Sequence, residues 1–405
     1  MRQIIVRAAI GIGGLFLILL LALGLWPVRP DVPQIGAGGH AGAPTAPTGG
    51  DVRGSGQTIA VQPGESIQSA VDQAQPGDTI RVLPGTYYEE VLVQTESLTL
   101  AGVLEGDQRP ILDGETKRAN GILGVGNYFS VTGFRVQNYT SNGVTVQGIT
   151  GVVFRDLITD QTGEYGLFPI LSTDILIERC VTSGVIDTGI YVGQSTQIVV
   201  RDSEAFGNVS GVEIENSTKA VVENNYLHDN TGGILVFLLP GKTAAEGYGT
   251  QVINNRIINN NLPNFARSEM TVALVPAGTG LLIMSADTTE VTGNTFEGNK
   301  SFAVGVVAMT DFPGFFGDRK QWDVPTRPDG NWIHDNTYLN NAYDPAPGVI
   351  EAGFEAADLE WSTTGFDNRW DDPAATRFPS LLPASAWPTF FRRIFERSIN
   401  FLAHL

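Results

Sequence analysis

The sequence has a single cysteine, Cys180, among its 405 residues. One cysteine excludes an internal disulfide, and its position in an apolar run predicts a buried core thiol. The four histidines form no cluster with cysteine, which argues against a zinc site. Basic residues are also few, because 25 Lys and Arg stand against 43 Asp and Glu, for a formal net charge of −18. A chain this acidic repels nucleic acid, so we expect no nucleic-acid partner.

Long apolar runs are scarce, but one opens the chain. Residues 8–26 are apolar and follow Arg2 and Arg7. This arrangement predicts a signal peptide or a retained membrane anchor over residues 1–26. Residues 27–57 are rich in Pro, Gly and Ala, which predicts a flexible linker. A tether of this length favours a retained anchor, and the body is then expected outside the cytoplasmic membrane, in the periplasm or at the cell exterior.

A glycine-led apolar motif returns every 22 or 23 residues in the middle of the chain. It starts at Gly143, Gly166, Gly189, Gly211 and Gly233. A second apolar run follows each glycine, and a polar pair of residues follows that run. Strands too short to bury a core alone, repeated at a fixed period, indicate a solenoid whose coils stack. Alternating apolar residues with Gly, Asn and Asp at the corners make it an all-β parallel β-helix with one strand per face in each coil.

The β-helix is expected over residues 58–341, and the segments around it have their own patterns. Apolar residues at helical spacing in 66–74 predict a cap helix over the N-terminal end of the core. Residues 342–405 are expected to form an irregular wrap and then an amphipathic C-terminal helix, which closes the solenoid or docks on a membrane or partner. Three insertions break the rhythm, at about 239–248, 262–277 and 310–330.

Asparagines recur at the corners of successive coils. They are Asn208, Asn230, Asn260 or Asn261, and Asn299. Stacked asparagine side chains can hydrogen-bond from coil to coil, as in other repeating β structures. The alternative is turn chemistry alone, since asparagine tolerates the left-handed backbone conformation.

Residues 67–87 read IQSAVDQAQPGDTIRVLPGTY. This run resembles the opening of right-handed parallel β-helix proteins of the pectin-lyase-like superfamily, including the NosD-like carbohydrate-binding and sugar-hydrolase group. The resemblance implies a right-handed helix but no single activity, because such scaffolds carry lyases, hydrolases, esterases, epimerases and non-catalytic proteins. The repeats lack the clustered Arg and Lys that lyases and epimerases of this group use to neutralise uronates.

The alternation of strand residues predicts which side chains face outward. If the residue after each glycine points into the core, the second residue after it points out. The resulting outer row is unusually apolar, and such a patch calls for a cover or a ligand. We predict that it binds substrate beneath the three insertions, through Phe168, Tyr191, Leu235 and Phe237.

Three acidic residues on this predicted face are the catalytic candidates. Glu213 and Glu215 are alternate residues of one strand, roughly 6.5–7 Å apart at the backbone, and Asp187 lies just before a neighbouring strand. Such a separation suits paired acid and base carboxylates acting on a sugar. The alternatives are solvated surface charges or calcium ligands, and no other cofactor is expected.

Two functions remain open from the sequence. The first is an exported protein that binds or processes a carbohydrate polymer, as hydrolase, lyase or epimerase. The second is a non-catalytic, membrane-tethered scaffold that engages an exported redox or metal-processing protein.

Overall fold

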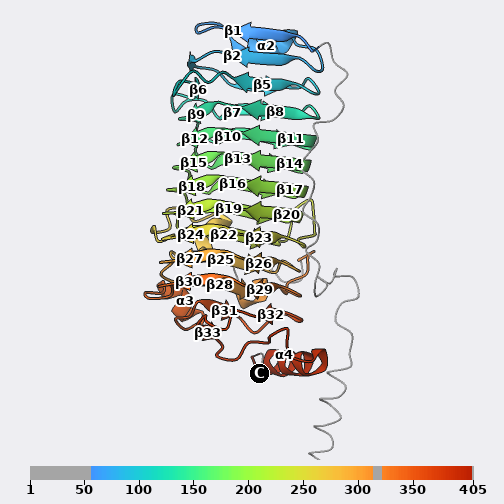
Figure 1. The fold of residues 1–405 in the computed structure, drawn as a ribbon, viewed down its shortest axis with the longest axis vertical. Helices are drawn as coiled ribbons and strands as arrows, with labels where there is room; N and C mark the ends of the chain where they lie inside the picture. The colour runs from blue at the N-terminus through green and yellow to red at the C-terminus, as the bar shows by residue number, and fades with distance from the viewer. Residues whose placement is uncertain (1–55, 313–321, 404–405) are drawn as a thin grey trace, which may run out of the picture.

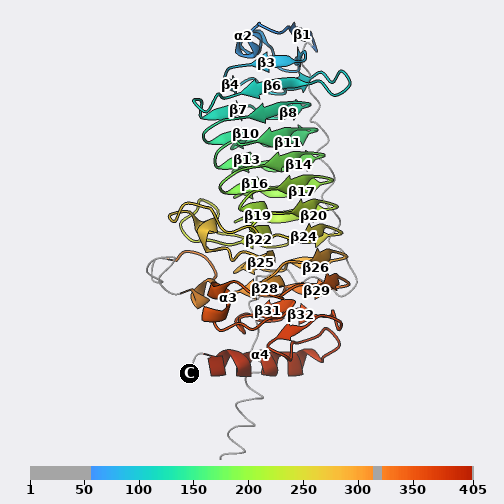
Figure 2. The ribbon, with the colours of Figure 1, turned by 90° about the vertical axis from the view of Figure 1, so that its left-hand side faces the viewer.

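The computed structural model describes residues 56–312 and 322–403 and shows a right-handed parallel β-helix (Figures 1 and 2). The predicted anchor at residues 1–26 and the linker up to residue 55 lie outside the described residues. Within the described ranges, no helix combines the length and the apolar character that a membrane crossing requires.

Three parallel sheets, here called A, B and C, form the sides of the solenoid. Sheet A contains β1 (Thr58–Val61), β2 (Thr79–Val82), β5 (Thr99–Gly102), β8 (Phe129–Thr132), β11 (Thr150–Arg155), β14 (Thr173–Glu178), β17 (Thr196–Arg201), β20 (Thr218–Glu223), β23 (Gln251–Ile253), β26 (Glu290–Thr292), β29 (Trp332–His334) and β32 (Arg369–Trp370). Sheet B contains β3 (Gly85–Tyr87), β6 (Pro110–Asp113), β9 (Arg135–Gln137), β12 (Ile158–Asp160), β15 (Val181–Ser183), β18 (Glu204–Phe206), β21 (Tyr226–His228), β24 (Arg256–Ile258), β27 (Thr295–Glu297) and β30 (Thr337–Leu339). Sheet C contains β4 (Val91–Val93), β7 (Asn120–Gly124), β10 (Asn142–Gln147), β13 (Tyr165–Ile170), β16 (Thr188–Gly193), β19 (Ser210–Glu215), β22 (Gly232–Phe237), β25 (Thr279–Met284), β28 (Phe302–Val307), β31 (Leu359–Trp361) and β33 (Arg377–Phe378).

The glycine-led motifs form the strands of sheet C, and their register confirms the predicted phase. Leu167 pairs with Ile190, which pairs with Val212 one coil later. All three side chains are buried in the core inside the solenoid. Cys180 lies in the same core, and burial raises the pKa of its thiol to about 12. The predicted core thiol is therefore confirmed, in a protonated and unreactive form.

The corner asparagines form a hydrogen-bonded ladder, as one of the two interpretations predicted. The Asn260 Oδ1 accepts hydrogen bonds from the Asn230 backbone N–H (3.3 Å) and from Asn230 Nδ2 (3.0 Å). Asn299 repeats this arrangement with Asn260 at 3.1 Å for both contacts. Asn260 rather than Asn261 is thus the ladder residue. A second ladder, which the sequence reading did not identify, consists of Asn225, Asn255, Asn294 and Asn336.

Helices close both ends of the core. At the N-terminal end, α2 (Ile67–Gln73) starts at Ser66, whose hydroxyl accepts from the Ser69 backbone N–H, and buries its apolar face. At the other end, α4 (Thr389–Ala403) lies across the last coils (Figures 1 and 2). Phe395 of α4 packs against the core. The two predicted helices are present at the two ends.

The sheets continue beyond residue 341, where the β-helix was expected to end. Strand β31 pairs with β28, and β32 pairs with β29. The helix α3 (Pro347–Glu351) lies in the connection before β31. The short strands β31 and β32 lack the glycine-led motif, and this absence hides the additional coil from a search for the period.

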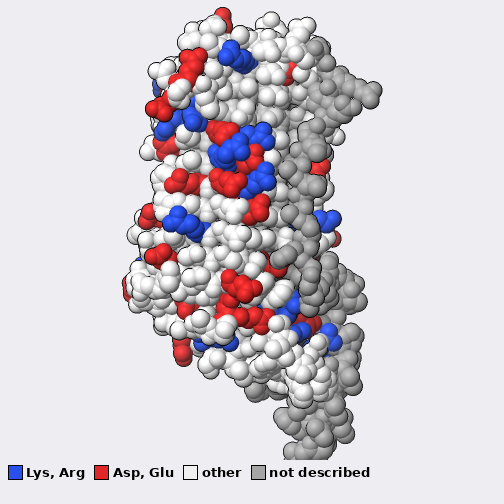
Figure 3. Space-filling view, in the orientation of Figure 1, with Lys and Arg blue, Asp and Glu red and all other residues white. Residues whose placement is uncertain are grey.

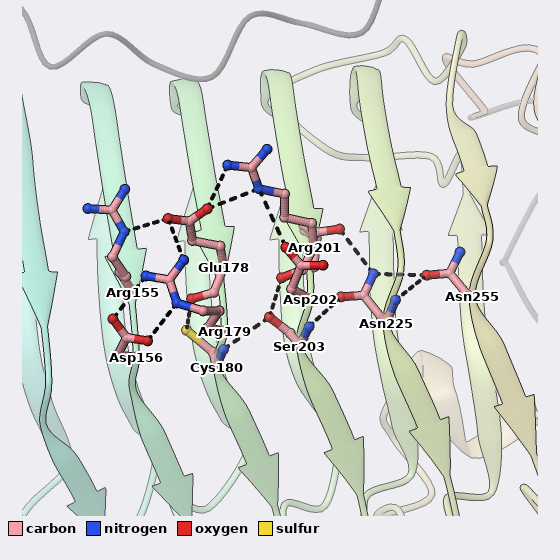
Figure 4. A network of polar contacts seen from close by, with 11 residues as sticks. Arg155, Asp156, Glu178, Arg179, Cys180, Arg201, Asp202, Ser203, Asn225 and Asn255 are labelled. Atoms are coloured by element: carbon pink, nitrogen blue, oxygen red, sulfur yellow. Dashed lines mark hydrogen bonds and ion pairs between the residues drawn. The ribbon is translucent and has the colours of Figure 1, made fainter.

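An ion-pair network covers the ends of the sheet A strands (Figure 4). The Glu178 carboxylate, which is buried, accepts hydrogen bonds from Arg155 and from Arg201, the latter at 2.6 Å. Arg179 bonds to Asp156 at 2.8 and 3.0 Å. Figure 3 shows basic and acidic side chains intermixed at this level of the molecule. The polar pairs noticed in the sequence thus lie where sheet A strands end and turns begin, and Arg155, Glu178 and Arg201 form ion pairs from coil to coil.

The Glu178→Gln substitution is expected to lower the free energy of unfolding at pH 7 by about 1–3 kcal/mol. Burial favours the protonated acid, but hydrogen bonds from Arg201 and Arg155 outweigh it and lower the pKa of Glu178. A lowered pKa stabilises the fold above the unfolded-state pKa, and this contribution is lost as the pH falls. Denaturant unfolding at pH 7 and pH 3 should therefore show a larger effect at pH 7. Glu223→Gln, one coil beyond Arg201 in the same row, is the matched control, and equal effects of both variants would contradict the prediction.

Candidate functional site

The predicted site residues lie on the outward side of sheet C. The register places Tyr191, Glu213 and Leu235 in one row across β16, β19 and β22. Glu215 and Phe237 lie in the neighbouring row, beside Gly193. Asp187 directly precedes β16. The structure therefore brings all three candidate carboxylates onto one face.

Asp187 and Glu213 share a single hydroxyl group. The Thr188 Oγ1 lies 3.0 Å from Asp187 Oδ1 and 2.9 Å from Glu213 Oε2. A hydroxyl has one hydrogen to donate, so it cannot donate to both carboxylates at once. One of the two acids must instead carry a proton and donate to the threonine oxygen.

The environment decides which acid keeps that proton. Burial raises the pKa of Glu213 well above its usual range, and the nearby charges of Asp187 and Glu215 raise it further. Burial also raises the pKa of Asp187, to about 6, although hydroxyl donors from Thr188 and Tyr165 oppose this. Glu213 therefore donates to Thr188, which donates to Asp187. Tyr165 donates to the other Asp187 oxygen at 3.0 Å.

Glu215 is held differently from the other two carboxylates. Its Oε1 accepts a hydrogen bond from the Tyr191 hydroxyl at 2.8 Å and forms an ion pair with Lys242 Nζ at 3.0 Å. Gly193 makes room for the Tyr191 ring, because a Cβ there would lie 2.2 Å from the tyrosine oxygen. Lys242 comes from the first insertion, so this loop supplies the positive charge that Glu215 faces.

The predicted substrate-binding residues divide into two groups. The rings of Phe168, Tyr165 and Tyr191 contact one another: the Phe168 centroid lies 4.4 and 4.8 Å from those of Tyr165 and Tyr191, which are 5.1 Å apart, and Phe168 is half-buried. Leu235 and Phe237 are instead buried in a second apolar cluster, with Val272 and Val275 of the second insertion. The insertion and α3 project from the same side of the stack (Figure 2).

The expectation of an open apolar platform is therefore corrected for Leu235 and Phe237, because the insertion's own apolar residues exclude water from them, and for Tyr191, which is 4% exposed. The third predicted insertion contributes η2 (Met309–Asp311), and its residues 313–321 lie outside the described residues. The second insertion contributes η1 (Thr271–Leu274).

Sequence reasoning missed Thr188, Tyr165 and Lys242. A signal existed for the first two, because Tyr165 and Thr188 occupy the same register position immediately before the coil glycines. No such signal existed for Lys242, since the insertion that carries it has no period. The same holds for Arg267 of the second insertion, which forms an ion pair with Glu164.

Replacing Asp187 by asparagine is expected to change how stability depends on pH. A raised pKa means that the protonated acid stabilises the fold below the unfolded-state pKa of about 3.9, and that this contribution is lost as the pH rises through about 6. Between pH 4 and pH 7, the free energy of unfolding of Asp187→Asn should therefore increase by on the order of 2–3 kcal/mol relative to that of wild type. Denaturant unfolding across this range measures the difference, with the exposed Asp344→Asn as control. A difference that stays constant with pH would show that Asp187 titrates normally.

No group of three or more His, Cys, Asp or Glu residues is arranged to hold a metal ion within residues 56–312 and 322–403.

Comparisons with known proteins place this geometry in context. No curated protein matches the chain in sequence. The alginate lyase from Paenibacillus sp. strain FPU-7 superposes with a TM-score of 0.50 at 16% identity, over 72% of this chain and 99% of that one. The A-module of the mannuronan C-5 epimerase AlgE6 from Azotobacter vinelandii gives 0.48 at 16% identity, over 76% and 94%. At this identity the likeness to the lyase shows the fold alone. A family model described as periplasmic copper-binding protein (NosD) matches residues 125–375, more than half of the chain. The chain therefore belongs to the NosD family.

Proposed function

We propose that the protein binds and processes a carbohydrate polymer outside the cytoplasmic membrane, with Asp187 as the proton-transferring group. The observation behind the proposal is that Asp187 and Glu213 both hydrogen-bond to the Thr188 hydroxyl. The contacting rings of Phe168 and Tyr191 lie on the same face. An acid whose pKa is about 6 can both give and take a proton near neutral pH.

The three acids have different roles in this proposal. Glu213 is 1% exposed and bonds to Thr188, so it is the positioning residue, whereas Asp187, at 5%, is the less deeply buried of the two acids. Asp187 also contacts Tyr165, which is half-buried. Glu215 forms an ion pair with Lys242. A sugar ring stacked on Phe168 would then lie close to Asp187, since aromatic rings and sugar faces pack through apolar contact.

The location of this activity follows from the family. Its description names a periplasmic protein, which supports the periplasm as the compartment. Retention of residues 8–26 as an anchor belongs to the same proposal. Alkaline extraction of membranes tests it, because an anchored chain stays with the lipid fraction.

Product analysis tests the function itself. The full chain is incubated with a panel of neutral and weakly charged polysaccharides, and the products are analysed by mass spectrometry. We expect new oligosaccharides, whose ends show either an added water, from hydrolysis, or an unsaturated sugar, from elimination. An unchanged panel, together with unchanged sugar configuration by NMR, would count against the proposal.

The family description favours a second candidate, a periplasmic accessory role with a redox or metal-processing partner. The two described histidines do not form a copper site together. His228 and His334 lie on different sheets, and each has carboxylates at both ring nitrogens. Equilibrium dialysis of the full chain with copper separates the candidates, since stoichiometric binding would favour the second.

A further inference from the structure

A separate pocket lies further along the outward face of sheet C. The register places Leu282, Gly305 and Glu360 in one row on β25, β28 and β31. Gly305 has no side chain, and the Phe302 ring and the Leu282 side chain pack over it, 3.0 and 3.2 Å from where a Cβ would stand. Phe378 of β33 occupies the next position in the row. The pocket lies beside this row, and both Gly305 and Glu360 line it.

Apolar side chains from four parts of the chain enclose this pocket. They come from sheet C, from the second insertion, from Phe312 directly after η2, and from α3 and its connection to β31. The lining includes Phe237, Met284, Phe302, Val275, Val349 and Phe354. The space that a water-sized sphere can reach is about 50 Å³, whereas one water needs about 10–15 Å³. The pocket therefore has room for a ligand of several heavy atoms.

Glu360 is the one titratable side chain among the described residues that line the pocket. Its side chain is 2% exposed, and its Oε1 is buried with no hydrogen-bond partner among the described residues. Burial alone raises its pKa to about 9, so the acid is protonated at neutral pH. A buried polar group without a partner costs stability. A fold keeps such a residue where a ligand uses it.

We propose that this pocket binds a small, uncharged and mainly apolar molecule that carries one oxygen acceptor, an alcohol or a carbonyl, with Glu360 as the hydrogen-bond donor. The apolar lining supplies the contact area, and the acid supplies the one directional contact, which is the usual division in small-molecule sites. An ammonium ligand would bring three donors and a charge into an apolar lining with a single carboxyl to receive them. A carboxylate ligand would repel Glu360 whenever that acid ionised. The site is separate from the Asp187 centre and does not rest on carbohydrate activity.

Two substitutions separate the hydrogen bond from the apolar contact. Glu360→Gln keeps a donor and an acceptor of nearly the same shape, whereas Glu360→Leu removes both and fills the same space with an apolar side chain. We expect Glu360→Leu to raise the Tm by about 2–4 °C, because it removes an unpartnered acid from the apolar pocket. Binding and stability should thus change in opposite directions in this variant.

Three probes with one ring test the ligand class on the full chain: cyclohexanol, cyclohexane and cyclohexylammonium. Binding is followed by ligand-observed NMR and by titration calorimetry. Cyclohexanol should bind wild type and Glu360→Gln with similar affinity, and Glu360→Leu about 5–30-fold more weakly, the usual worth of one hydrogen bond. Cyclohexane should bind wild type no better than it binds Glu360→Leu. Absence of cyclohexanol binding, equal cyclohexanol affinity for wild type and Glu360→Leu, or tighter binding of cyclohexylammonium would each overturn the proposal.

Discussion

The Asn260→Ala substitution is expected to lower the free energy of unfolding by about 3–5 kcal/mol. Asn260 accepts two hydrogen bonds from Asn230 and donates to the Leu227 carbonyl and to Asn299 Oδ1. Removing its amide leaves the Asn230 backbone N–H without this partner and takes one contact from each of the other groups, in a part of the structure that water does not reach, where Asn260, Asn230 and Asn299 are fully buried. Each unsatisfied buried group costs about 1–3 kcal/mol, and neighbouring ladder members can relax only partly.

Thermal and denaturant unfolding of the full chain measure this loss. The preceding residue provides a control, since Asn259 is exposed and adopts a positive φ of 52°. Asn259→Gly keeps this conformation available and removes an exposed amide, so we expect a change below about 1 kcal/mol. If Asn260→Ala were no more destabilising than Asn259→Gly, the ladder would be a by-product of turn geometry and not a source of stability.

The Asp187→Asn substitution is expected to lower turnover of a cleaved polysaccharide by about 10²–10⁴-fold. Asparagine has nearly the same shape, but it keeps only one of the two oxygens that accept from Thr188 and from Tyr165, and it cannot transfer a proton. The aromatic stacking of Phe168 with Tyr165 and Tyr191 does not involve the carboxyl group. We therefore expect the loss in kcat rather than in KM, measured on the substrate that the polysaccharide panel identifies.

Glu213→Gln separates the positioning role from proton transfer. Glutamine can still donate to Thr188, so the chain of hydrogen bonds persists, and we expect a loss smaller than that of Asp187→Asn. Glu213 is already protonated in the acidic range because burial raises its pKa, so the acidic limb of the pH–rate profile, which reports Asp187, should stay in place. Asp344→Asn, an exposed carboxyl on the segment before α3, serves as the control and should leave turnover unchanged. Full activity of Asp187→Asn would remove Asp187 from the catalytic machinery.

The repeating part of the fold could be predicted because the residues of each coil carry the same local pattern. The glycine-led strands from Gly143 to Gly233 and their core residues, such as Ile190 and Val212, recur at 22 or 23 residues, and corner asparagines mark the coils beyond. Stacking in register then follows from the period, because equivalent positions in successive coils must face the same way. The outward face with Asp187, Glu213 and Glu215 was derived from this register alone.

The sequence by itself thus determined the β-helix, the inward and outward faces and the two closing helices. Only the tertiary structure decided which outward residues stay accessible, because the cover comes from insertions without a period. Val272 and Val275 bury Leu235 and Phe237, and Lys242 neutralises Glu215. The hydrogen bonds of Thr188 to Asp187 and Glu213, and the burial of Glu360 Oε1 without a partner, likewise depend on distances between coils. Such contacts join residues that are neighbours only after the coils have stacked, and no local pattern encodes them.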